Sequence, residues 1–256
     1  MTIPRRLATL VAATALGISL AFVPQVHAQA LAGEPTPSGP YRMTLGDHSD
    51  FVSQATNTWC VAASMQMMLN IVGSENDSSV AKQESLIELA RSYRSQASQP
   101  SQPSTSNRPR GAPSSGWAAG LTKLGAGRHR VTSAATFEVA VEMIARAIRA
   151  TGRPAGILVW KGAHAWVVSG FESTADPATT AAFDVTGVVV MDPWYPRTSS
   201  IWGASPPPGS MLMTAQFATE YLPINRPNRP SIYTGRFVVV MPFDVVRILD
   251  RYVSPS

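Results

Sequence analysis

The amino-acid sequence predicts an α+β domain, because helical patterns precede strand patterns along the chain. In the first half, apolar residues recur at the spacing of buried or amphipathic helices. In the second half, short segments rich in β-branched residues are bounded by Gly, Pro or polar residues, which is typical of strands. We therefore expect N-terminal helices, one of them central, followed by a C-terminal antiparallel sheet.

The chain begins with a predicted secretory signal over residues 1–28. Two arginines precede an apolar stretch over 7–23, and 26–28 have the small-residue pattern of a signal-peptidase site. We expect cleavage after Ala28 and secretion to the extracellular space or the periplasm. The alternative is an uncleaved anchor, because 7–23 is close to the shortest stretch that can span a membrane.

The rest of the chain is expected to form one domain over residues 51–256, after a flexible lead-in over 29–50 that is rich in Gly, Pro and polar residues. Residues 95–116 contain no large aliphatic side chain. They cannot bury enough apolar surface to offset the entropy of ordering them, so we expect a disordered insertion there. Apart from the signal, no long apolar segment is present, so no membrane partner is expected after cleavage.

The individual elements follow from the residue pattern. Residues 60–73 are almost wholly apolar, which predicts a helix in the middle of the domain, capped by Asn57 or Thr58 and ending at Gly73. Further helices are expected at 79–93, 117–124, 136–150 and near 214–221, and strands at 157–160, 165–168, 188–191 and 237–241. The remainder of 194–230 is expected to be a long loop.

Charge and cysteine content exclude several classes of protein. The formal net charge of +5 comes from 21 basic and 16 acidic residues, and the basic residues are scattered without interleaved aromatics. We therefore expect no nucleic-acid partner. A single cysteine allows no internal disulfide, so an exported domain must rely on its core. We expect a monomer.

That single cysteine, Cys60, is either a small buried hydrophobe or a reactive thiol. The apolar pattern places Cys60 at the N-terminus of the helix over 60–73. Unpaired amides and the helix dipole stabilise a thiolate at such a position. The sequence therefore favours a reactive thiol.

A base and an orienting acid are predicted from two strands. His164 lies at the mouth of the strand 165–168, where an imidazole can point off the sheet edge toward a helix end. Asp192 directly follows the strand 188–191, so adjacent antiparallel strands would bring His164 and Asp192 side by side. An acid that accepts from the second ring nitrogen orients a catalytic histidine. Each residue alone has a purely structural explanation, but their combination predicts catalysis.

The other histidines receive no such support. His48 and His129 have no predicted element to frame them, so we expect neither a catalytic nor a metal-binding role. No pair of His, Cys or carboxylate residues has ligand spacing on one element. We expect no metal and no cofactor.

The motifs together resemble the papain-like cysteine peptidases. Gln54 precedes Cys60 by six residues, as does the oxyanion-hole glutamine of that family, and 59–64 are similar to the start of its nucleophile helix. His164 resembles the histidine at its strand, and Asp192 resembles the third catalytic residue, followed two positions later by a shielding tryptophan, Trp194. The resemblance is greatest to bacterial Cys-His-Asp members, the bacteriocin-leader peptidase-like group and the papain-like avirulence proteases.

The resemblance implies a papain-like fold and an endopeptidase that hydrolyses peptides or proteins through a thioester acyl-enzyme. It further implies that the amide of Gln54 helps to form the oxyanion hole. Two alternatives stay open. The same triad could transfer the acyl group to an amine or act on cell-wall amides, because a thioester serves either acceptor. The chain could also be an inactive exported binding module, since Val61 stands where Gly or Trp is commoner.

Overall fold

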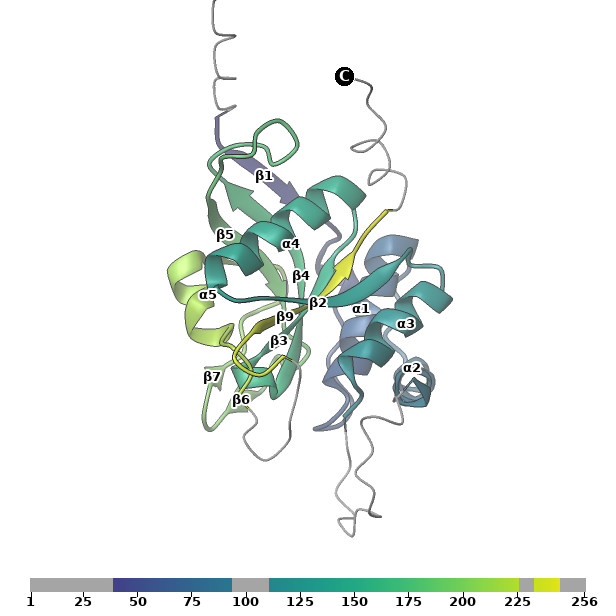
Figure 1. Cartoon of the computed structure of the whole chain (residues 1–256). Helices are drawn as coiled ribbons and strands as arrows, with labels where there is room; N and C mark the ends of the chain where they lie inside the picture. The colour runs from purple at the N-terminus through teal and green to yellow at the C-terminus, as the bar shows by residue number, and fades with distance from the viewer. Residues whose placement is uncertain (1–38, 94–110, 226–232, 245–256) are drawn as a thin grey trace, which may run out of the picture. The chain divides into compact units, whose positions relative to one another are not determined.

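The structure is a computed structural model that describes residues 39–93, 111–225 and 233–244 (Figure 1). These residues all belong to the unit that begins at Pro37. The predicted signal over 1–28, residues 29–38 of the expected lead-in and residues 95–110 of the expected insertion lie outside the described residues. Within the described residues, no helix is long and apolar enough to cross a membrane.

The helices follow the predicted apolar patterns closely. They are α1 (Cys60–Gly73), α2 (Val80–Ser92), α3 (Ser114–Lys123), α4 (Phe137–Thr151) and α5 (Thr214–Glu220). Side-chain caps explain two of the starts, because Ser79 accepts from the amide of Lys82 and Thr136 from that of Val139. The start of α3 corrects the predicted insertion, since 114–116 are helical and not disordered.

The strands form a seven-stranded antiparallel sheet in the order β2-β9-β3-β4-β5-β8, with β1 also paired to β4. Their bounds are β1 (Tyr41–Thr44), β2 (His129–Ala134), β3 (Ala155–Val159), β4 (His164–Ser173), β5 (Val185–Met191), β8 (Ser210–Met213) and β9 (Phe237–Pro242). A separate two-stranded ribbon pairs β6 (Thr198–Ser199) with β7 (Gly203–Ala204). The mixture of helices and antiparallel sheet confirms the α+β class.

Both faces of the sheet are covered. Figure 1 shows α1, α2 and α3 on one side of the strands and α4 and α5 on the other. Residues along β4 alternate between two apolar clusters: Ala165 and Val167 join the α1–α3 side, whereas Trp166 and Val168 join the α4–α5 side. Burial on both faces makes β4 the centre of the domain and fixes where its first residue lies.

The expected lead-in over 29–50 is wrong for its second half. Tyr41–Thr44 pairs with the far end of β4, and a short 3₁₀ turn over His48–Asp50 follows. The strand requires a close approach, because a Cβ on Gly170 would lie 2.3 Å from the carbonyl oxygen of Met43. The folded domain therefore begins before residue 51.

The expected long loop over 194–230 is also more ordered than predicted. In addition to α5, it contains the β6–β7 ribbon and β8, which completes one edge of the sheet. The strand β2, over His129–Ala134, was likewise not predicted. β2 and β8 take their pairing partners from more distant segments, and β6 and β7 are only two residues long, so no local pattern marks any of them.

Candidate active site

Cys60 is the first residue of α1, and its thiol is free and half-buried. The N-cap residue is Trp59, and it makes no side-chain hydrogen bond to the helix, so the expected cap by Asn57 or Thr58 is wrong. Amides at the start of α1 are thereby not consumed by a capping side chain. They remain available to stabilise negative charge beside Cys60.

His164 and Asp192 meet at one end of the paired strands β4 and β5. His164 opens β4, and Asp192 follows the last residue of β5, which pairs with Val167. The Nε2 atom of His164 lies 2.7 Å from Oδ1 of Asp192, and the two side chains are 5% and 0% exposed. The predicted juxtaposition of these two residues is therefore present.

The other neighbour of the imidazole is Cys60, which raises the pKa of His164. Since Nε2 of His164 faces Asp192, Nδ1 is the ring nitrogen left for the thiol. The structure thus brings Cys60, His164 and Asp192 together, from the start of α1, the start of β4 and the end of β5.

Two hydrogen bonds, both to Oδ1, hold the Asp192 carboxylate. Its Oδ1 also accepts a 2.8 Å hydrogen bond from the backbone amide of Trp194. The Trp194 ring lies 6.3 Å from the imidazole of His164 at 80° to its plane. Arg197 places its guanidinium 5.0 Å from the centre of the Trp194 ring and hydrogen-bonds the carbonyl of Gln54. Arg197 therefore connects the residues after β5 with the segment before α1.

The electrostatics of His164 follow from these partners. Burial by itself lowers the pKa of His164, but the hydrogen bond with Asp192 and the presence of both Asp192 and Cys60 raise the pKa by more. The net result is a pKa of about 9. At neutral pH the imidazole is therefore protonated, as a proton donor to a departing group must be.

Gln54 is tied to the residue after Asp192, and one N–H of its side-chain amide is used in a local hydrogen bond. Its side chain is buried, and its backbone amide donates to the carbonyl of Pro193 at 2.8 Å. The Nε2 group donates to the carbonyl of Thr56 at 2.7 Å. An amide nitrogen carries two hydrogens, so one N–H remains for another acceptor.

Sequence reasoning missed Trp160, which directly follows β3. Its indole stacks on the His164 imidazole, with ring centres 4.4 Å apart and planes 19° apart. The sequence pattern placed Trp160 inside a strand, but its φ of 55° is left-handed. The one sequence signal was Gly162, a residue that favours turns, two positions later.

The two other histidines among the described residues lie apart from this arrangement. His48 is exposed in its 3₁₀ turn. His129 does have a structural frame, contrary to expectation, because it opens β2 and is buried. Among the described residues, no three His, Cys, Asp or Glu side chains are grouped so as to hold a metal ion.

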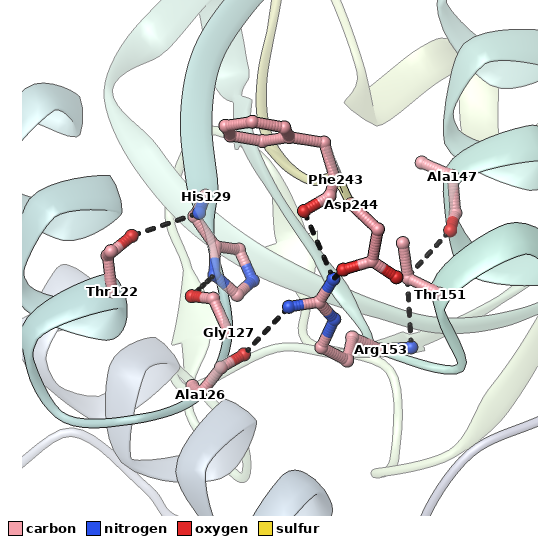
Figure 2. Close-up of polar contacts among 9 residues, drawn as sticks. All are labelled: Thr122, Ala126, Gly127, His129, Ala147, Thr151, Arg153, Phe243 and Asp244. Carbon is pink, nitrogen blue, oxygen red and sulfur yellow. Dashed lines mark hydrogen bonds and ion pairs between the residues drawn. The ribbon is translucent and has the colours of Figure 1, made fainter. Parts of the chain in front are cut away.

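The charged group that acts on His129 is a guanidinium, not a carboxylate. Figure 2 shows Arg153 beside His129, held by the carbonyls of Ala126 and Phe243 and by an ion pair with Asp244. Burial is the main cause that lowers the pKa of His129, and the charge of Arg153 lowers it further, to about 4. A hydrogen bond to the Gly127 carbonyl opposes this only in part.

Comparison with protein families places most of the chain in a family. Residues 48–227 match the model of the peptidase C39-like family. This span is more than half of the chain, and it includes Gln54, Cys60, His164 and Asp192. A search of curated proteins found no match.

Proposed function

The chain belongs to the peptidase C39-like family, and from this premise we propose an exported cysteine endopeptidase in which Cys60, His164 and Asp192 act as nucleophile, acid–base and orienting residue. The observation that carries the proposal is the position of His164, whose ring is hydrogen-bonded to Asp192 and whose pKa is raised by both Asp192 and Cys60. A nucleophile, a base and an orienting acid held next to one another form the unit that nucleophilic catalysis requires.

The proposed first step forms a thioester. The Cys60 thiolate attacks the carbonyl carbon of the scissile peptide bond, and the electron pair of the C=O bond moves to oxygen. The electron pair on oxygen then re-forms the C=O bond as the C–N bond breaks, and the protonated Nδ1 of His164 gives its proton to the departing amine, leaving a thioester on Cys60.

The second step releases the acid. A water molecule attacks the thioester carbon and transfers a proton to His164, and the C–S bond breaks to regenerate the thiolate. Asp192 is not itself protonated in either step; its hydrogen bond to Nε2 keeps Nδ1 facing Cys60.

Two donors are proposed for the oxyanion that forms in each step. One is the backbone amide of Cys60, at a helix start that lacks a side-chain cap. The other is the N–H of Gln54 that Thr56 does not use. Burial of Gln54 would strengthen such a hydrogen bond, because little water competes for it.

The alternative of an inactive binding module was suggested by Val61, and the position of Val61 does not favour it. Val61, the unusual residue after the cysteine, is buried within the apolar cluster on the α1–α3 side of the sheet. Its side chain therefore belongs to the core, and the substitution is compatible with an active site at Cys60.

Replacement of Cys60 tests the proposal. The whole chain and its Cys60→Ala and Cys60→Ser variants are incubated with a mixed peptide library, and products are identified by mass spectrometry. We expect new peptide N-termini from the wild type and nearly none from either variant, with little loss of stability because the side chain is small. Turnover retained by Cys60→Ala would end the proposal. Loss of free amines without cleavage would instead indicate acyl transfer.

Export is proposed from the sequence of residues 1–28. N-terminal sequencing of the protein from a culture medium or a periplasmic fraction tests it. We expect the chain to begin at Gln29. A chain that keeps residues 1–28 and fractionates with membranes would show an anchor instead.

A further inference from the structure

The turn between β3 and β4 has an unusual backbone. Trp160 and Lys161 have φ values of 55° and 56°, and Gly162 follows at 84°. Left-handed conformations are costly for residues other than glycine, above all for a bulky aromatic. Such strain persists only where neighbouring structure holds it, and it lies here within four residues of His164.

Contacts from the chain around residue 225 hold the turn itself. The backbone amide of Asn225 donates to the carbonyl of Lys161 at 3.3 Å. Ile224 packs so closely on Gly162 that a Cβ there would lie 3.0 Å from its side chain. The turn thus has a partner outside its own hairpin.

A charged hydrogen bond holds the ring of Trp160. The indole Nε1 donates to Oε2 of Glu220, the last residue of α5, at 2.6 Å. Hydrogen bonds to a carboxylate are stronger than neutral ones. Trp202, from the β6–β7 ribbon, adds a second indole that is parallel to Trp160 within 1° at 5.9 Å. The plane of Trp160 is therefore fixed from two further elements.

The fixed indole presents its face to His164, whereas Trp194 meets the same imidazole nearly at a right angle. The face of an indole is electron-rich and attracts a cation, so stacking favours the imidazolium over the neutral ring. The stack also restricts rotation of the imidazole, which has to keep Nδ1 toward Cys60. Trp160 therefore stacks on the face of the imidazole, whereas Trp194 meets it edge to face.

We propose that Trp160 is a positioning residue for His164, and that the strained turn and the bond to Glu220 serve to hold its indole against the imidazolium of the Cys60 pair. The catalytic meaning of this inference rests on the proposed peptidase function. The physical claim, that the indole holds His164 in its charged form, does not depend on turnover.

The test follows the imidazole of His164 by NMR as a function of pH in the whole chain, together with kcat and KM. In Trp160→Leu, which keeps apolar bulk but removes the aromatic face, the titration midpoint of His164 should fall by about one pH unit. We expect kcat to fall about tenfold at neutral pH, with KM changed less than about twofold, as for loss of an orienting group. Trp160→Phe restores a face without the N–H and should recover most of both.

A folded Trp160→Leu whose His164 titrates as in the wild type would overturn the inference. If Trp160→Leu does not fold, Glu220→Ala replaces it, because that change releases the indole without touching His164 or Cys60. We expect a smaller shift in the same direction, and an unchanged midpoint would again overturn the inference. A shifted midpoint in a protein whose wild type cleaves no peptide would leave the positioning role standing and refute the peptidase.

Discussion

Two buried histidines, His164 and His129, lie in opposite electrostatic surroundings. His164 opens β4 between Asp192 and Cys60, and its pKa is raised to about 9 although burial opposes the rise. His129 opens β2 beside Arg153, and burial followed by that cation lowers its pKa to about 4. Burial alone therefore does not decide the charge of a histidine. In His164 the neighbouring carboxylate and thiol outweigh burial, whereas in His129 burial is the main cause and the Arg153 guanidinium adds to it.

The two shifts make opposite contributions to stability. His164 stabilises the folded state in full below its unfolded pKa of about 6.5, and this contribution is lost as the pH rises through about 9. His129 has no effect on stability above pH about 6.5. As the pH falls from there toward about 4, the unfolded form gains a proton that the folded form does not take up, so the folded state is destabilised. For these two groups, stability is therefore greatest near the pH where both unfolded histidines titrate.

Removal of His164 is expected to have the largest effect on activity. We expect His164→Ala to lower kcat by on the order of 10⁴-fold to 10⁶-fold, about as much as loss of Cys60, because members of one catalytic unit act non-additively. His48→Ala is the matched control, since His48 is exposed and outside the site, and it should be unchanged. Peptidase kinetics on both variants decide this, and equal activities would remove His164 from the mechanism.

Loss of the carboxylate should have a smaller effect than loss of the imidazole. Asp192→Asn keeps the volume and an oxygen for the amide of Trp194 but removes the charge that raises the pKa of His164. We expect kcat to fall roughly 10-fold to 100-fold less than in His164→Ala. The alkaline limb of the pH–rate profile should move to lower pH. An unmoved limb would mean that Asp192 does not set the charge of His164.

Loss of the Gln54 amide should lower kcat less than loss of the Asp192 carboxylate. Gln54→Ala removes one proposed oxyanion donor, and we expect kcat to fall roughly 10²-fold to 10³-fold with KM little changed. Thermal denaturation serves as the control, because the variant also loses the hydrogen bond to the carbonyl of Thr56. Kinetics identical to the wild type would show that the amide of Gln54 faces Thr56 alone.

The smallest expected effect on activity is at His129. His129→Asn keeps a donor for the Gly127 carbonyl but cannot titrate, so activity at neutral pH should be unchanged. The fall in unfolding free energy between pH 6.5 and pH 4 should shrink by ~3 kcal/mol relative to the wild type. Urea denaturation at the two pH values measures this. An equal loss of stability in both proteins would place the acid sensitivity elsewhere.

The sequence sufficed where the pattern was local. The apolar run over 60–73 predicted α1 and the position of Cys60, and strand patterns before Asp192 and after His164 predicted their adjacency. Their catalytic roles stay a prediction. Tyr41–Thr44 escaped notice because its partner in β4 is more than a hundred residues away and only the bare backbone of Gly170 admits it.

Trp160 and His129 show why the rest could not be predicted. Trp160 is of a residue type common in strands, but its φ is left-handed, and its ring and its turn contact Glu220 and Ile224, which are distant in the sequence. The lowered pKa of His129 comes first from its burial and then from Arg153, and both follow from where β2 lies in the fold. Both effects are tertiary and leave no trace in residue spacing.

The central claim, that His164 activates Cys60, is tested most directly by the rate of iodoacetamide alkylation as a function of pH. Because Cys60 is the only cysteine, every modification reports on this site. We predict rapid alkylation of the wild type at pH 5, where an ordinary thiol with a pKa of about 8.5 is almost wholly protonated, and slow alkylation of His164→Ala at the same pH. Alkylation that rises only near pH 8.5 and is identical in both proteins would contradict the account.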